Sequence, residues 1–350
     1  MKSGIYRAFL ALTLICVLFF TPGAASPSSD DLTDAGYIAL DSGDNRMAED
    51  LFTRALGPGF GQNSPLAWAG LGKALWNDSS SSNEASYTAF NRSLECVNSS
   101  SEDWNAVLMV FFNEPVEDFE LSYSAGLKAL EADPDNDVAW NYFGCVIDGL
   151  AHNNSDADLN EPFDAFKNAM ALNPTPLYSC NVAYYAIVTG NYSYAVEVTD
   201  KALKYYNPDN WWKGDLLFFK AFALAEMGES EEALENIELS RKFYNSDESF
   251  EWDDYYYTTD GMVSATALND LGRFDESAEI LGRIDTDRLD DYVEGLLFTP
   301  ENYMDLYGVA LSGLGKTDDA AAAFEKSLEY NSDYIPAKEH LENLSQNTSV

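Results

Sequence analysis

Basic residues are scarce in this chain. Only 20 of its 350 residues are Lys or Arg, against 59 Asp and Glu, so the net charge at neutral pH is −39. A surface this acidic repels the phosphate backbone of nucleic acids and the head groups of anionic lipids. We therefore expect no nucleic-acid partner. The acids are spread along the chain, which favours a role in general solubility or in a salty environment, with a basic partner as the alternative.

Histidine is scarcer still, and this removes much of the usual enzymatic chemistry. We expect His152 in a loop and His340 on the outer face of the last helix, so neither is placed for Ser/His/Asp or Cys/His catalysis. No cysteine pair has zinc-ligand spacing, and no glycine-rich phosphate loop follows a strand pattern. Asp156 to Asn160 resembles the start of a calcium loop, but Glu161 stands where the loop's glycine belongs. We predict no catalytic residue, no metal and no cofactor.

Cysteine is also rare. Apart from Cys16 near the N-terminus, the chain has only Cys96, Cys145 and Cys180. An odd number gives no disulfide framework, so we predict buried free thiols, with a single Cys145–Cys180 bridge as the alternative.

The chain has one long apolar run, at its N-terminus. Lys2 and Arg7 precede the run from Phe9 to Phe20, and small residues follow it up to Ala25. The run is shorter than the roughly 20 residues of a spanning helix, and its flanks are typical of a secretory signal peptide. We predict a signal peptide at residues 1–25 and an exported protein that is extracellular or associated with the cell envelope. An uncleaved N-terminal anchor is the alternative.

Apolar residues otherwise follow a helical period. The clearest unit runs from Glu301 to Tyr334, where Gly308 and Leu311 lie on a first helix and Gly315 breaks it. Small and large apolar residues then mark a second helix: Ala320, Phe324, Ser327 and Leu328. The pattern recurs with a period in the mid-thirties and resembles the tetratricopeptide repeat. This resemblance implies an all-α, right-handed α-solenoid of about eight helix–turn–helix units, closed by a C-terminal capping helix.

The units can be placed along the chain. Their first helices are expected to begin near Ser29, Pro65, Ser101, Asp137, Pro176, Gly214, Thr258 and Glu301. The third unit is the weakest, because Gly126 stands where an aromatic residue is usual. Ile335 to Leu344 is predicted to form the cap, and the connection from Arg283 to Pro300 to be a surface insertion, with a functional loop as the alternative. We expect a single repeat domain over residues 26–344 and a disordered tail over 345–350.

In this family the first helices line a concave groove, which implies a non-catalytic scaffold that binds an extended peptide or a helix of an unknown protein partner. By register, the groove candidates are Asn105, Met109, Asn141, Tyr184, Phe218 and Phe222, with Phe112 and Cys145 beside them. The Lys and Arg of the family's two-carboxylate clamp are absent from these positions. The alternative is that Phe218 and Phe222 pack between units.

Aromatic density suggests a second function. Trp211, Trp212 and Trp252 lie near unit junctions among many tyrosines. Aromatic rings stack on sugar faces, and neighbouring carboxylates accept hydrogen bonds from hydroxyls. A cell-surface glycan-binding module is therefore the alternative function.

Overall fold

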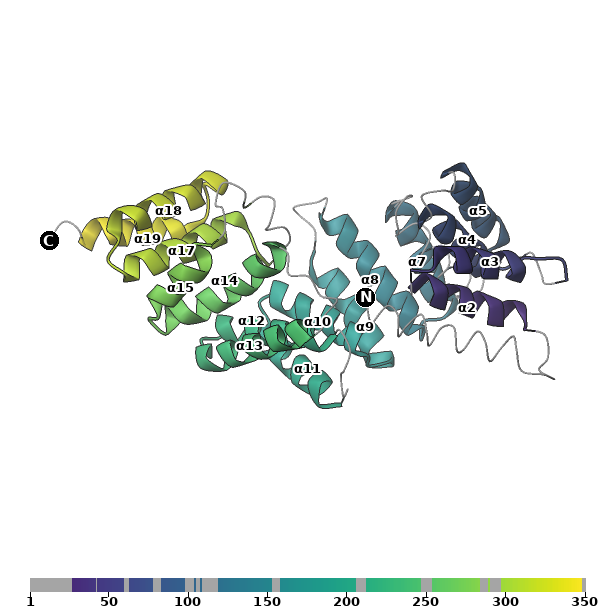
Figure 1. Cartoon of the computed structure of the whole chain (residues 1–350), viewed down its shortest axis with the longest axis horizontal. Coiled ribbons are helices and arrows are strands. Elements are labelled where there is room, and N and C mark those ends of the chain that lie inside the picture. Colours follow the sequence, from purple (N-terminus) through teal and green to yellow (C-terminus); the bar gives the residue numbers. More distant parts are fainter. Residues whose placement is uncertain are drawn as a thin grey trace. The chain divides into compact units, whose positions relative to one another are not determined.

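The computed structural model describes residues 27–41, 43–59, 63–77, 83–97, 104, 108, 119–152, 158–205, 212–246, 254–283, 289 and 297–347. The chain forms two compact units, Met1–Pro174 and Thr175–Val350, which we call the N-terminal and C-terminal units and describe separately. In the described residues, every labelled element is a helix (Figure 1). The predicted all-α class is confirmed.

The helices alternate as first and second members of antiparallel pairs. Those of the N-terminal unit are α2 (Ser29–Asp41), α3 (Asn45–Ala55), α4 (Pro65–Asn77), α5 (Asn83–Cys96), α7 (Phe119–Ala132), α8 (Asp137–His152) and α9 (Asn160–Leu172). Those of the C-terminal unit are α10 (Pro176–Val188), α11 (Tyr192–Tyr205), α12 (Trp212–Glu226), α13 (Ser230–Ser246), α14 (Asp254–Asp270), α15 (Phe274–Leu281), α17 (Pro300–Gly313), α18 (Thr317–Tyr330) and α19 (Ile335–Asn347).

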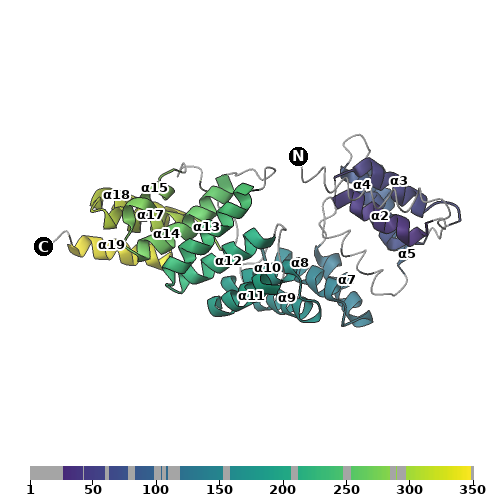
Figure 2. The same cartoon turned by 60° about the horizontal axis from the view of Figure 1, so that its bottom comes forward.

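The predicted first helices are found close to their expected starts. Those predicted at Gly214, Thr258 and Glu301 begin at Trp212, Asp254 and Pro300. The first helix of the third unit lies outside the described residues, apart from single positions. Within the C-terminal unit, each first helix packs on its own second helix and on the next first helix (Figure 2). This stacking buries apolar faces that one helix pair cannot bury alone.

Glycine sets the turn between the two helices of a pair. Five such turns place a glycine at φ between 70° and 78°: Gly43, Gly190, Gly228, Gly272 and Gly315. Only glycine adopts this left-handed conformation without a steric penalty, so it ends the first helix and reverses the chain.

A second set of glycines lets the paired helices approach. A Cβ atom at Gly308 would lie 2.5 Å from Cε1 of Phe324, and one at Gly144 would lie 2.7 Å from Cε1 of Phe166. Each ring of the second helix therefore occupies the space that a side chain on the first helix would fill. The weak third unit uses the reverse arrangement, because Gly126 on its second helix faces Phe143 of the following helix.

Serine hydroxyls join the helices of three pairs. Ser93, Ser240 and Ser327 on second helices donate to the carbonyl oxygens of Pro65, Gly214 and Glu301 at distances of 2.8 to 2.9 Å. These carbonyls lie in the first turn of the paired first helix, so the bonds fix the end of one helix against the start of the other.

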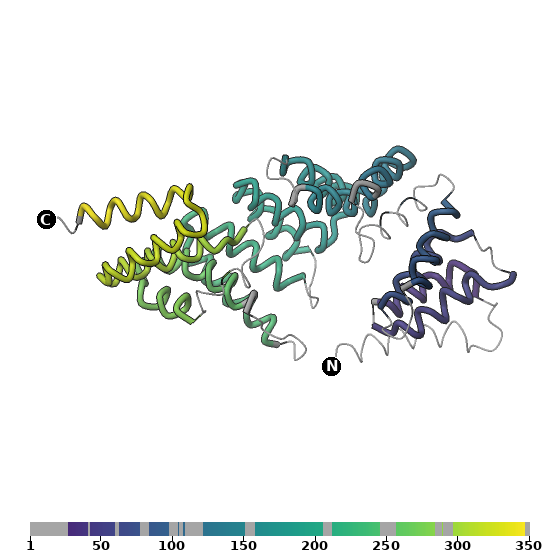
Figure 3. Tube along the Cα trace, turned by 90° about the horizontal axis from the view of Figure 1, so that it is seen from above, coloured from purple at the N-terminus to yellow at the C-terminus, as the bar shows by residue number. Residues whose placement is uncertain are grey.

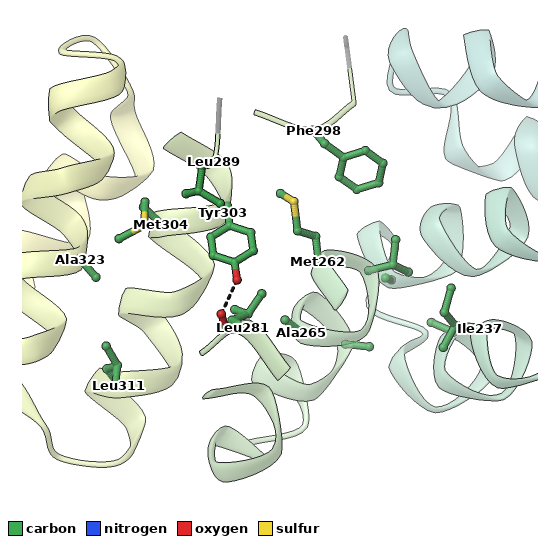
Figure 4. Packing of buried hydrophobic residues seen from close by; sticks show 14 of the residues in the cluster. Ile237, Met262, Ala265, Leu281, Leu289, Phe298, Tyr303, Met304, Leu311 and Ala323 are labelled. Atoms are coloured by element: carbon green, nitrogen blue, oxygen red, sulfur yellow. Dashed lines mark hydrogen bonds between the residues drawn. The ribbon is translucent and has the colours of Figure 1, made fainter. Parts of the chain in front are cut away.

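The main core of the C-terminal unit includes part of the connection before α17, which was predicted to be a surface insertion (Figure 4). Leu289 is 0% exposed and Phe298 is 5% exposed, and both belong to this core. For these two residues the surface prediction is wrong. The reason is that α12, α14 and α17 contribute apolar residues to this core, against which Leu289 and Phe298 pack.

The capping helix is also more than a polar lid (Figure 3, yellow). Ala337 is fully buried, and Leu341 and Leu344 pack against the core, as predicted. His340 was predicted on the outer face, and this is wrong: its Nδ1 lies 2.8 Å from Oδ1 of Asp305 in α17. Its ring packs on Phe324 with centroids 5.1 Å apart. His340 lies three residues after Ala337 and four before Leu344, and this spacing places it on the inner face with them.

Among the described residues, none of the helices is both long and apolar enough to cross a bilayer.

Candidate functional site

One half-buried lysine shows which side of α12 faces its neighbours. Lys220 Nζ lies 3.0 Å from Oδ1 of Asp200 in α11 and 3.0 Å from Oε1 of Glu232 in α13. Its side chain is only 13% exposed. Burial disfavours the ammonium, but the hydrogen bonds to both carboxylates outweigh it, so the pKa of Lys220 lies above its ordinary value. This side of α12 therefore faces the second helices.

Phe218 and Phe222 lie on the opposite side of α12. Each is two residues from Lys220, and two residues turn an α-helix by about 200°. The two rings therefore point away from α11 and α13. Both side chains are half-buried and pack against the main core of the C-terminal unit, so the alternative prediction of packing between repeats also applies to them.

Neighbouring rings continue this surface onto α10. Phe219 lies 5.8 Å from Phe218 between ring centroids, and Tyr184 lies 6.0 Å from Phe219, both with edge-to-face geometry. Tyr184 and Phe219 are also half-buried, and Phe219 packs on its other side against the buried cluster of Cys180, Ala202 and Leu216. We call the surface formed by Tyr184, Phe218, Phe219 and Phe222 the aromatic face.

Phe298 borders the aromatic face. Its ring centroid lies 6.1 Å from that of Phe218 and 5.4 Å from that of Phe222. Thr299 caps α17 by accepting a hydrogen bond from the backbone N–H of Asn302 at 3.3 Å, and Pro300 starts the helix. Phe298 is thus held directly before the cap, where an apolar residue commonly packs on the first turns of its helix. It covers part of the rings of Phe218 and Phe222.

Carboxylates flank the aromatic face. Asp215 and Glu226 lie on the same stripe of α12 as Phe218 and Phe222, one at each end. Asp215 accepts a short hydrogen bond from the hydroxyl of Tyr244, and burial raises the pKa of Asp215 above its ordinary value. Glu226 is exposed.

The other groove candidates belong to the N-terminal unit or to positions that the structure does not describe. Asn141 lies on α8 in the N-terminal unit and is 7% exposed, while Asn105, Met109 and Phe112 lie outside the described residues. Of the glycan candidates, Trp212 packs against the buried cluster of Cys180, Ala202 and Leu216. Trp211 and Trp252 lie outside the described residues.

The described residues hold little reactive chemistry. Cys96, Cys145 and Cys180 carry free thiols. Burial, and then the charge of Asp148, raise the pKa of Cys145 to about 12, and burial also raises the pKa of Cys180. Both thiols are therefore protonated at neutral pH and are poor nucleophiles. Within the described ranges, no group of three or more His, Cys, Asp or Glu is arranged to hold a metal ion.

Sequence reasoning missed two residues of this region, Phe219 and Phe298. Phe219 occupies a register position between the groove side and the packed side of α12, so the helical period alone did not select it. For Phe298 a signal was present: an apolar residue directly precedes Thr299-Pro300, a typical helix start.

Comparison with known proteins supports the fold. The family model described as "Tetratricopeptide repeat" matches residues 302–334, which cover most of α17 and all of α18. The structure of the Cut9–Hcn1 hetero-tetramer of the APC/C is similar with a TM-score of 0.58 and 14% identity. The match covers 90% of this chain but only 59% of that chain, so this chain spans well under two thirds of it.

Two further structures resemble this chain more loosely. A tetratricopeptide repeat protein from Parabacteroides merdae is 14% identical over 91% of this chain and 98% of that chain, with a TM-score of 0.43. Pseudomonas aeruginosa PilF is 14% identical over 63% of this chain and 93% of that chain, with a TM-score of 0.47. None of the curated protein sequences matches this chain. The family match and the first similarity together show a tetratricopeptide-type solenoid fold.

Proposed function

We propose that this protein is a non-catalytic scaffold that holds an extended segment or a helix of a protein partner against the aromatic face. The observation that carries the proposal is the position of Phe218 and Phe222 on the side of α12 opposite Lys220, with Tyr184 joined to them through the ring of Phe219. Half-buried aromatic side chains retain apolar surface for a partner, and tyrosine is enriched among residues that dominate binding energy.

The non-catalytic part rests on the state of the reactive groups. His340 is engaged by Asp305, and the thiols of Cys145 and Cys180 are protonated. The fold gives general support, because helical solenoids commonly present extended binding surfaces. The function itself must be argued from the residues of the site.

The proposal places the protein outside the cytoplasmic membrane, and the N-terminal sequence supports this part. A signal peptide at residues 1–25 would leave a mature chain that begins at Ser26. N-terminal sequencing of the protein recovered from its own cells tests this. A chain that still begins at Met1 would contradict the proposal of cleavage.

An affinity capture tests the binding function. The immobilised chain is exposed to the envelope fraction of its own cells, alongside a Tyr184→Ala variant. Tyr205→Ala is the matched control, because this tyrosine lies at the end of α11 and is 74% exposed. We expect specific proteins that are lost with Tyr184→Ala and kept with Tyr205→Ala. Identical capture by all three proteins would refute a role for the aromatic face.

Phe218 and Phe222 are less suitable as first test positions. Both rings contact the buried Phe298, so truncation would disturb the core together with the surface. Their alanine variants are informative only where far-UV circular dichroism and unfolding show that the C-terminal unit remains folded.

A further inference from the structure

We infer that the occupant of the aromatic face is a cationic segment, in which Lys or Arg side chains flank apolar ones. This inference rests on the proposed function, because it names the chemistry of the segment bound at the same surface.

The order of side chains along α12 favours a cationic segment. One stripe of this helix reads carboxylate, ring, ring, carboxylate: Asp215, Phe218, Phe222 and Glu226. Asp215 is bound by the hydroxyl of Tyr244, so Glu226, which is exposed and lies near the hydroxyl of Tyr192, is the carboxylate open to a partner. A Lys or Arg beside an apolar anchor would meet a carboxylate at the rim and the face of an aromatic ring next to it.

The charge on the neighbouring helices is mostly negative. The first helices α10, α12, α14 and α17 together contain seven carboxylates and two lysines, and two of these carboxylates, Asp260 and Asp305, are bound by Arg241 and His340. Lys220 is bound between Asp200 and Glu232 on the far side of α12, and Lys213 lies in the helix's first turn. An acidic segment would therefore meet mostly like charges, and like-charge contacts suppress the wrong partners.

Synthetic peptides test the inference directly. The probes are labelled peptides of about ten residues, which span roughly 33 Å when extended. One alternates Lys with Leu, the second alternates Glu with Leu, and the third alternates Lys with Ser. Binding to the full chain is followed by fluorescence anisotropy at low and at high salt.

A net charge of −39 attracts any cation, so a matched pair of variants is needed. Glu226→Gln removes the charge at the aromatic face and keeps a hydrogen-bond acceptor for Tyr192. Glu231→Gln removes an equal charge from an exposed position on α13, a second helix. Tyr184→Ala reports on the rings.

We expect the Lys/Leu peptide to bind more tightly than the other two. Glu226→Gln should weaken binding of the Lys/Leu peptide by about threefold, which is within the range of an exposed ion pair. Glu231→Gln should weaken it less than Glu226→Gln does. Tyr184→Ala should weaken it by roughly tenfold. Equal effects of both Gln variants would show that diffuse attraction explains the binding, and would overturn the inference. Equal binding of the Glu/Leu peptide would overturn it as well.

Failure of this inference is distinguishable from failure of the proposed function. If captured partners depend on Tyr184 but bind through acidic or neutral segments, the scaffold stands and the cationic class is wrong. If neither peptides nor captured proteins depend on Tyr184, the proposed function itself fails.

Discussion

Replacing Phe298 by Ala tests whether the connection before α17 is a structural part of the C-terminal unit. Phe298 is 5% exposed, and its ring packs against Phe218 and Phe222. Truncation of a buried Phe to Ala costs about 3 to 5 kcal/mol, which includes the lost transfer free energy and the cavity left behind. Because both neighbouring rings are half-buried and can relax, we expect the lower end, about 3 kcal/mol.

The cost is best measured locally, since a chain with two compact units need not unfold in one step. Amide hydrogen exchange read by mass spectrometry reports protection in α12, α14 and α17 separately from the rest. A loss of about 3 kcal/mol corresponds to a roughly hundredfold increase in the opening equilibrium. Phe298→Leu is the control, and it should cost only about 1 kcal/mol because most of the volume is kept.

A small effect would refute the reasoning. If Phe298→Ala changes protection in these helices by less than tenfold, Phe298 covers the aromatic face but does not stabilise the helices around it. The ring of Phe298 would then be displaceable, and the aromatic face would be larger than the contacts of Phe298 indicate.

Three further predictions concern other contacts. The hydrogen bond to Asp305 raises the pKa of His340 above its unfolded value of about 6.5, so its contribution is fully present below that pH and is lost as the pH rises through the folded pKa. Amide protection in α19, measured by hydrogen exchange, should therefore be greater at low pH than at high pH. His340→Gln should remove this pH dependence, and an unchanged pH profile in the variant would contradict the prediction. Arg241→Met should destabilise the C-terminal unit by about 3 kcal/mol. Arg241 Nε donates a hydrogen bond of 2.7 Å to the buried carboxylate of Asp260, which the substitution leaves without a cationic partner. Adding Asp260→Asn should recover much of the loss in denaturant unfolding, and an additive double variant would argue against the ion pair. Gly308→Val should destabilise by more than about 1 kcal/mol, since its Cβ would overlap the facing ring of α18, and a thermal unfolding midpoint equal to that of the native chain would exclude this close approach.

Much of the fold follows from local pattern. The repeat pattern predicts turns at Gly190, Gly228 and Gly272, and each of these glycines has a positive φ in the structure. The close approach at Gly308 also follows from the sequence, because Phe324 follows it at the spacing that the repeat pattern uses for a small residue and a facing ring. These features depend on residues within one unit, where spacing translates directly into helix faces.

The candidate site is less accessible to such reasoning. Register alone placed Tyr184, Phe218 and Phe222 on first helices and on one side of them. It did not select Phe219, and it did not reveal that Phe298 reaches Phe218 and Phe222 from a connection about 80 residues further along the chain. A contact of that separation leaves no periodic trace in the sequence.

The all-α repeat architecture, the acidic character and the side of α12 on which Phe218 and Phe222 lie can be read from the amino-acid sequence, because each depends on composition or on spacing within a helix. How far those rings are covered, and where His340 points, depends on tertiary packing. His340 meets Asp305 across 35 residues, and Leu289 and Phe298 enter the core because they pack against apolar residues of the stacked helices. Such burial arises only when several repeats stack, so the sequence of a single repeat does not predict it.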